Sequence, residues 1–212
     1  MSFQSFNLDV DSAKKADSEG GRINRTDKYV GIITRAEFVI SSKGTQGVEI
    51  AFETADKQDA TCTFWTFKAD NTPIFGRDKI NAIMACTGTR TLTPTDKQLE
   101  KYSYDAGGKV MQLCTIAPEL EGKAVGFLIQ MEEYLNGNGE LKTRPNFVSA
   151  FNPSNGLMAK EILERKTTPE ALDKAYARLM KGGDKKLPVQ QQSTAGYGAP
   201  APSYDDSDNL PF

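Results

Sequence analysis

The chain has 212 residues, of which 38% are hydrophobic, 25% charged and 9% aromatic, and its formal net charge is −2. This composition is typical of one globular domain with a polar tail, and it excludes a collagenous, coiled-coil or wholly disordered protein. The sequence contains no histidine, which excludes catalytic triads and metal sites that depend on this residue. Cys62, Cys86 and Cys114 include no C-x-x-C pair, so they predict neither a zinc site nor a disulfide framework.

The first 21 residues are polar, small and glycine-ended, and we expect them to form a flexible N-terminal segment. They contain no apolar run of signal-peptide length, and no stretch of 18 apolar residues occurs elsewhere. We therefore expect a protein of the cytoplasm, with no membrane partner.

Three strand-like segments follow this N-terminal segment, at residues 28–40, 48–54 and 60–68, and short polar turns separate them. In the second segment, Val48, Ile50 and Phe52 are expected to face the core. In the first, the alternation places Tyr29, Gly31, Arg35 and Glu37 on one face, and Val30, Ile32, Ala36, Phe38 and Ile40 on the apolar face that we expect to be buried.

The next segments complete the pattern of a small barrel. Apolar residues at three-to-four spacing predict a helix over residues 75–87, with Gly88 as its stop, and residues 89–122 are expected to be a long connection with one short helix. Residues 123–135 and 140–151 are two further strands around the turn Asn-Gly-Asn-Gly. This order predicts a mainly β protein, a five-stranded Greek-key barrel of the OB type with a helix between strands three and four. An SH3-like barrel and an α+β sandwich are the alternatives.

We expect the barrel to span residues 22–152 and a helical segment to span residues 153–183. In this segment Thr168 is the expected N-cap, Pro169 the first helical residue and Gly182-Gly183 the stop. Its apolar stripe is expected to cover the barrel. Residues 184–204 are expected to be a flexible linker, and residues 205–212 an acidic tip. The stripe consists of Leu172, Tyr176 and Leu179.

The sequence lacks the common enzyme motifs, including the phosphate-binding G-x-x-x-x-G-K-[ST] loop, G-x-G-x-x-G, H-E-x-x-H and G-x-S-x-G. Glu49, Glu53, Glu132 and Glu133 are carboxylates on expected strands, and the first two are interpreted as the solvent face of an edge strand. We therefore predict no catalytic role, no metal and no cofactor.

The third strand carries the main functional signal. Phe64 and Trp65 are adjacent, so they point to opposite faces of a regular strand. If Phe64 is in the core, then Trp65 and Phe67 lie on the outer face, where large rings can stack on nucleic-acid bases. The alternative is that the 89–122 connection or the C-terminal helix covers them.

Cations near these rings in the expected layout are suited to phosphate contacts along a groove. The predicted DNA-binding residues are therefore Tyr29, Arg35, Lys43, Trp65, Phe67, Lys68, Lys142 and Arg144.

The sequence ends in Asp-Asp-Ser-Asp-Asn-Leu-Pro-Phe after a polar linker, a combination that favours a peptide docking on a partner protein over a solubilising end. It resembles the acidic tip of bacterial single-stranded-DNA-binding proteins, with Leu210 in place of the usual isoleucine and with Ser207 and Asn209 interrupting the acids. The predicted docking residues are Asp205, Asp206, Asp208, Leu210, Pro211 and Phe212.

The barrel region, roughly residues 22–166, is similar to bacteriophage and prophage single-stranded-DNA-binding proteins, a divergent OB-fold family with the same kind of tip. The resemblance rests on KYVGIITRAEFVISSKGTQGVEIAFET, FWTF and ELEGKAVGFLIQMEEY. It implies binding of single-stranded DNA with little sequence preference during phage replication, recombination or repair, in the cytoplasm of the bacterial host.

The tip would then recruit a helicase, exonuclease, polymerase or annealing protein. A strand-annealing recombination protein and a protein-interaction adaptor are the alternative functions. The oligomeric state stays open, with a homo-oligomer among the alternatives.

Overall fold

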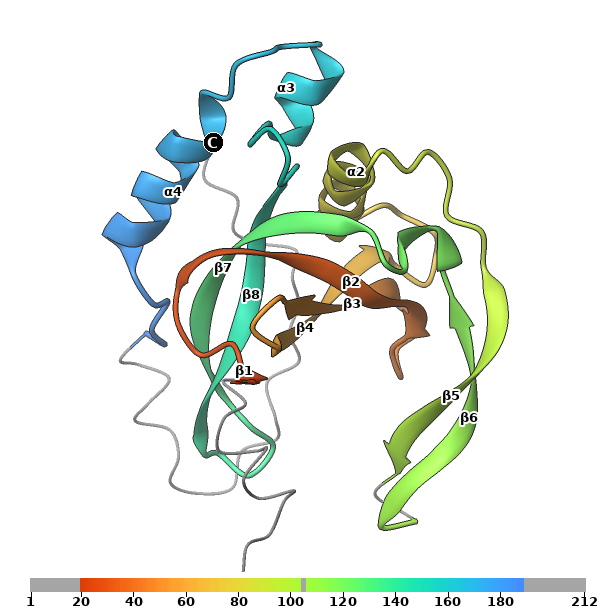
Figure 1. The fold of residues 1–212 in the computed structure, drawn as a ribbon. Coiled ribbons are helices and arrows are strands. Elements are labelled where there is room, and N and C mark those ends of the chain that lie inside the picture. Colours follow the sequence, from red (N-terminus) through yellow and green to blue (C-terminus); the bar gives the residue numbers. More distant parts are fainter. Residues whose placement is uncertain (1–19, 104–105, 189–212) are drawn as a thin grey trace, which may run out of the picture.

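The computed structural model describes residues 20–103 and 106–188 (Figure 1). Residues 1–19 of the expected N-terminal segment, residues 189–204 of the expected linker and the acidic tip lie outside the described residues. The bounds of both segments need correction: Gly21 belongs to a strand that pairs with residues 58–59, and Lys185 exchanges backbone hydrogen bonds with Met131 and Glu133. The described part is mainly β, with one curled mixed sheet that forms a half-barrel and a few short helices. The strands are β1 (Gly21–Arg22), β2 (Asp27–Ile40), β3 (Gln46–Thr54), β4 (Gln58–Phe67), β5 (Thr95–Ser103), β6 (Gly108–Ile116), β7 (Ala124–Leu135) and β8 (Leu141–Phe151).

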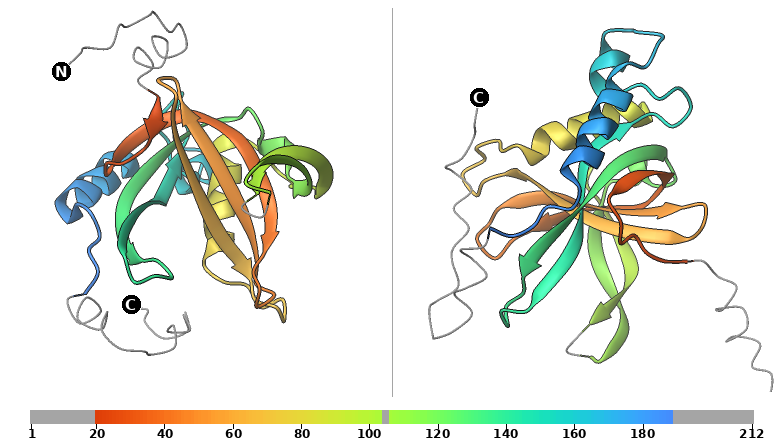
Figure 2. Two further views of the ribbon diagram at one scale, coloured as in Figure 1. Left: turned by 90° about the horizontal axis from the view of Figure 1, so that it is seen from below. Right: turned by 90° about the vertical axis from the view of Figure 1, so that its left-hand side faces the viewer.

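The long strand β2 is the centre of the sheet. It pairs antiparallel with β3 from Gly31 to Ile40 and with β7 from Asp27 to Ile32. β4 continues the sheet beyond β3, and β8 continues it beyond β7, both in antiparallel pairing. The sheet curls, and helix α2 (Gly76–Thr87) contacts both outer strands, β4 and β8 (Figures 1 and 2). The half-barrel and the helix after the third long strand agree with the sequence-based prediction.

The facing predicted for the first half of β2 is wrong. Val30 and Ile32 are 50% and 42% exposed, whereas Ile33 and Ala36 are buried. The cause is a register shift between Ile33 and Arg35 in the pairing with β3, which adds one residue and reverses the alternation. Ile40, at the end of the strand, is also exposed. Period-two patterning does not reveal such a bulge, so the prediction holds only for Ala36 and Phe38.

The core is built around an aromatic cluster between the two halves of the sheet. Phe127 lies with its ring centroid 5.1 Å from that of Phe52 and 4.5 Å from that of Phe147. Phe64 packs edge-on against Phe147 at 6.2 Å. The expected burial of Val48, Ile50 and Phe52 is confirmed, and the apolar face of α2 closes the core with Ile80, Ile83 and Cys86.

The segment expected to be a long connection contains a β-hairpin, which is a correction. β5 and β6 pair antiparallel over their whole length, from Thr95↔Ile116 to Ser103↔Gly108. We call this hairpin, residues 95–116, the arm; it projects away from the half-barrel at the lower right of Figure 1. Its base is attached to β2 through the pair Glu37↔Ile116. The expected short helix is only the 3-10 turn η1 (Pro118–Leu120). The prediction failed because β5 is almost entirely polar, so its sequence carries no hydrophobic alternation.

Two helices follow β8: α3 (Ala159–Leu163) and α4 (Ala171–Gly182). Leu172 and Leu179 of α4 pack with Leu128 and Phe151, so the helix lies along the outside of β7 and β8 (Figure 2). The predicted covering role of its apolar stripe is confirmed. α4 therefore does not cover Trp65.

The predicted start of α4 at Thr168 is wrong, because the buried carboxylate of Glu161 supplies the cap. It accepts hydrogen bonds from the backbone N–H groups of Glu170 and Ala171 at 2.8 and 2.9 Å. It also accepts the N–H of Met158 at 2.9 Å, which caps α3. One side chain from α3 thus fixes the start of both helices.

These three N–H donors hold the pKa of Glu161 below its ordinary value of 4.5. The carboxylate therefore stabilises the fold at pH values above 4.5, and its contribution is lost as the pH falls through the lowered pKa. We expect Glu161→Gln to lower the Tm by several degrees at pH 7 and to flatten the acid dependence of the Tm. Thermal unfolding by circular dichroism from pH 7 to pH 3 measures both effects. Glu164→Gln, at the end of the same helix, is the control, and identical acid profiles for both variants would contradict the capping role.

Candidate nucleic-acid interface

The outer face of β2, β3 and β4 contains Trp65, the only tryptophan of the chain. In the strand register Trp65 lies opposite Gly47, which lies opposite Val39; the next row of the same face is Thr63, Glu49 and Glu37. Trp65 is 37% exposed, whereas its neighbour Phe64 is buried in the core. The predicted orientation of these two rings is confirmed; a role of Trp65 in binding stays a prediction.

Gly47 allows the indole of Trp65 to lie across the adjacent strand. A Cβ atom on Gly47 would lie 2.8 Å from Cε3 and 3.3 Å from Cζ3 of the indole. The ring therefore lies against the backbone of β3, while the residue keeps 37% of its surface exposed. Such a supported flat ring is suited to stacking on an unpaired base.

Further aromatic rings and cations follow Trp65 along the chain. The guanidinium carbon of Arg77 lies 5.8 Å from the ring centroid of Phe67. Phe75, which precedes α2, is 68% exposed, and Nζ of Lys79 lies 5.2 Å from its ring centroid. Sequence reasoning missed Phe75 and Arg77. The feature that could have indicated them is an aromatic residue, Phe75, that lies outside the apolar pattern of the helix and is followed by the cations Arg77 and Lys79.

Lys43 and Lys68 lie in two turns that meet at this end of the sheet. A Cβ atom on Gly44, in the turn after β2, would lie 3.0 Å from the Cβ of Ala69, in the turn after β4. Both lysines are exposed, and neither forms an ion pair within residues 20–103 and 106–188. They are therefore available for phosphate contacts beside Trp65 and Phe67.

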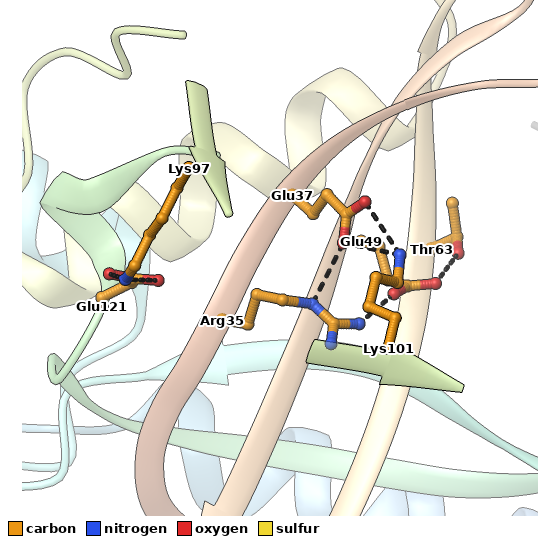
Figure 3. A network of polar contacts seen from close by, with 7 residues as sticks. All are labelled: Arg35, Glu37, Glu49, Thr63, Lys97, Lys101 and Glu121. Atoms are coloured by element: carbon orange, nitrogen blue, oxygen red, sulfur yellow. Dashed lines mark hydrogen bonds and ion pairs between the residues drawn. The ribbon is translucent and has the colours of Figure 1, made fainter. Parts of the chain in front are cut away.

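Arg35 lies on the same outer face but is not free. Its Nε lies 3.2 Å from a carboxylate oxygen of Glu37, and its Nη2 donates a hydrogen bond to Glu49 (Figure 3). Lys101, from the arm, donates to both oxygens of Glu37 at 2.9 and 3.0 Å. The sequence places Glu37 on the same face of the strand as Arg35, but it indicates neither the ion pair with Glu49 nor the contact with Lys101.

The other three predicted residues are engaged elsewhere. Tyr29 packs against the core, its hydroxyl donates to the carbonyl of Arg25 at 3.0 Å, and burial raises its pKa. Lys142 and Arg144, near the hairpin end of β7 and β8, form ion pairs with Glu140 at 3.2 Å and Glu132 at 3.4 Å. The structure therefore brings together Lys43, Trp65, Phe67 and Lys68, leaves Arg35 paired beside them, and gives Tyr29 a packing role.

Comparison with protein-family models gives no match for the chain, and comparison with curated proteins gives none either. Among the described helices, none is both long enough and apolar enough to cross a membrane. Residues 20–103 and 106–188 hold no group of three or more His, Cys, Asp or Glu side chains placed to bind a metal ion. The chemistry of the outer face is thus the basis for a functional proposal.

Proposed function

We propose that the protein binds single-stranded DNA with little sequence preference, using the outer face of β3 and β4. The observation that carries this proposal is the exposed indole of Trp65, which is supported on Gly47 and lies near the exposed cations Lys43 and Lys68, neither of which forms an ion pair with another described residue. Stacking on an aromatic ring contributes about 1–3 kcal/mol per base and tolerates any base, because every base has a π-face. Lysines at the edge of the rings add phosphate contacts that carry no sequence information.

We also propose that the half-barrel is an OB fold. The connectivity supports this: β2 pairs with both β3 and β7, β8 follows β7, and α2 lies between the third and fourth barrel strands. β3 and β7 both run antiparallel to β2, and β4 and β8 run antiparallel to β3 and β7. β4 and β8 therefore have the same direction as β2 and are parallel to each other across the open side. In this assignment the arm is an insertion between α2 and β7. OB folds bind single strands on the face of their second and third strands, which here are β3 and β4.

The proposed role in phage replication, recombination or repair, and membership of the phage family of such proteins, rest on the sequence resemblance. Recruitment of partner enzymes by Asp205, Asp206, Asp208, Leu210, Pro211 and Phe212 is a proposal about residues outside the described part of the chain. Strand annealing and a purely adaptor function remain alternative proposals, and no contact among the described residues favours either of them.

The test of this function is a fluorescence anisotropy titration of labelled oligo(dT), compared with a duplex of the same length, over a series of salt concentrations. We expect much tighter binding of the single strand, because a duplex hides the base faces. The log of the affinity should fall by about 0.7 per phosphate contact for each log unit of salt. Lys43→Gln combined with Lys68→Gln should therefore reduce this slope by about 1.4.

Lys160→Gln combined with Lys181→Gln removes the same charge from exposed positions on α3 and α4 and is the matched control. It should leave the slope nearly unchanged. Equal affinity for the duplex and the single strand would contradict base stacking, and an equal loss of slope in both double variants would contradict the assignment of the two turn lysines.

A further inference from the structure

We propose that Arg35 and Lys101 form a second phosphate-binding pair beside Trp65, and that Glu49 competes with the DNA phosphate for Arg35 and so limits the affinity for single strands. This inference rests on the proposed function. It adds Lys101 of the arm to the interface and assigns a regulatory part to an acidic residue of the binding face.

The position of the pair relative to Trp65 follows from the strand register. Thr63 precedes Trp65 by two residues on the same face of β4, so their Cα atoms are about 7 Å apart. The hydroxyl of Thr63 donates to Glu49 at 3.5 Å, and Glu49 accepts a hydrogen bond from Arg35 (Figure 3). A strand whose base stacks on Trp65 therefore passes its backbone close to this ion-pair network.

The two carboxylates of the network differ in how firmly they are held. The side chain of Glu37 is only 8% exposed, and it lies between Nε of Arg35 and the amine of Lys101. Cys114, on the arm, also lies against it: burial raises the pKa of this thiol, and its hydrogen bond to the Glu37 carboxylate raises it further. Glu37 thus anchors the arm to β2 and is not free to leave.

Glu49, in contrast, is held by one cation and one long hydrogen bond from Thr63. The side chains of Glu49, Arg35 and Lys101 are 25%, 27% and 28% exposed, so solvent and a ligand reach all three. The positive charges of Arg35 and Lys101 balance the negative charges of Glu37 and Glu49, so the network has no net charge. Binding of a phosphate in this network is favourable only if the phosphate replaces the carboxylate of Glu49 as the partner of Arg35. Glu49 is therefore the carboxylate that a phosphate can displace.

The charge-removing variant Glu49→Gln tests this directly, because it keeps the shape and releases Arg35. Glu53→Gln is its matched control: Glu53 lies on the same face of β3, has a 32% exposed side chain and pairs with Lys57 instead. Affinity for oligo(dT) is measured by anisotropy from 50 mM to 0.5 M salt. We expect Glu49→Gln to tighten binding about twofold to fivefold at low salt, the strength of a partly exposed ion pair, and Glu53→Gln to have little effect.

The advantage of Glu49→Gln should shrink at high salt, where exposed ion pairs are screened. Lys101→Gln should weaken binding and reduce the salt slope by about 0.7. Lys101→Arg keeps the positive charge and should retain both the affinity and the salt slope of the unmodified protein. Equal gains from Glu49→Gln and Glu53→Gln would overturn the inference, since net charge alone would then explain them. A loss of affinity in Glu49→Gln, with an unchanged Tm, would also overturn it.

The failure of the proposed function has a different signature. If the unmodified protein does not bind oligo(dT), or if binding does not depend on Trp65, both the function and the inference are wrong. If binding depends on Trp65 while the two glutamate variants respond equally, only the inference is wrong.

Discussion

Replacing Trp65 by alanine is expected to weaken the binding of oligo(dT) by about 1–3 kcal/mol, which is roughly fivefold to 150-fold. The reason is the loss of a flat ring that lies on Gly47 and is 37% exposed. Affinity measured by anisotropy gives the effect, and the melting temperature of the variant gives its cost to the fold. We expect a modest drop in Tm, because the ring lies on the outer face and not in the core.

Trp65→Phe is the matched control for this substitution, because it keeps an aromatic face at the same position. It should retain most of the affinity that Trp65→Ala loses. If alanine and phenylalanine bind oligo(dT) equally well, the indole is not a stacking platform. A loss of stability as large as that of a buried ring, with little change in affinity, would show that Trp65 serves the fold.

Phe127→Ala is expected to destabilise the protein by about 3–5 kcal/mol, the usual cost of removing a buried aromatic ring. Phe127 is fully enclosed between Phe52 and Phe147, and its loss leaves a cavity between the two halves of the sheet. Urea unfolding followed by circular dichroism measures the change in the free energy of unfolding. The sheet cannot collapse around the gap, because its strands are held by the ladders on both sides of β2.

Phe75→Ala removes the same ring from an exposed position before α2 and is the matched control. It should change the free energy of unfolding by no more than about 0.5 kcal/mol, as surface substitutions usually do. It should also weaken DNA binding if Phe75 extends the aromatic face. Equal destabilisation by the two variants would contradict the division of the phenylalanines between core and surface.

The parts of the fold that the sequence predicts well are those with strong apolar patterns. Val48, Ile50 and Phe52 alternate with polar residues, and their burial follows from the period of a strand. The helix over residues 76–87 follows from its three-to-four spacing and from Gly88, which takes the left-handed conformation at its end. Both signals are local, so one sequence is enough to read them.

The parts that could not be predicted depend on contacts between distant segments. The bulge between Ile33 and Arg35 is set by the pairing of β2 with β3, and it has no signature in the alternation. The arm has a polar strand that is stabilised by its partner β6, so its apolar content gave no indication of a strand. The start of α4 depends on Glu161, which lies nine and ten residues before the groups that it caps.

The candidate site divides in the same way. The outward direction of Trp65 follows from its place next to a core residue; the sequence also places Lys43 in a turn and Lys68 at the end of the third strand. Whether a cation is free depends on which acids the fold places beside it. Arg35 meets Glu49 from a neighbouring strand, and Glu37 also binds Lys101, which is 64 residues away. These pairings are visible only in three dimensions. They mean that a phosphate must compete with Glu49 for Arg35.

The measurement that tests the central claim most directly is the intrinsic fluorescence of Trp65 during titration with oligo(dT). The chain has a single tryptophan, so the signal reports on one ring of the proposed interface. We predict strong, saturable quenching by oligo(dT), reversed by salt, and little quenching by a duplex of equal length. Tryptophan fluorescence that stays constant while anisotropy shows oligo(dT) binding would contradict the account, because the strand would then lie elsewhere on the protein.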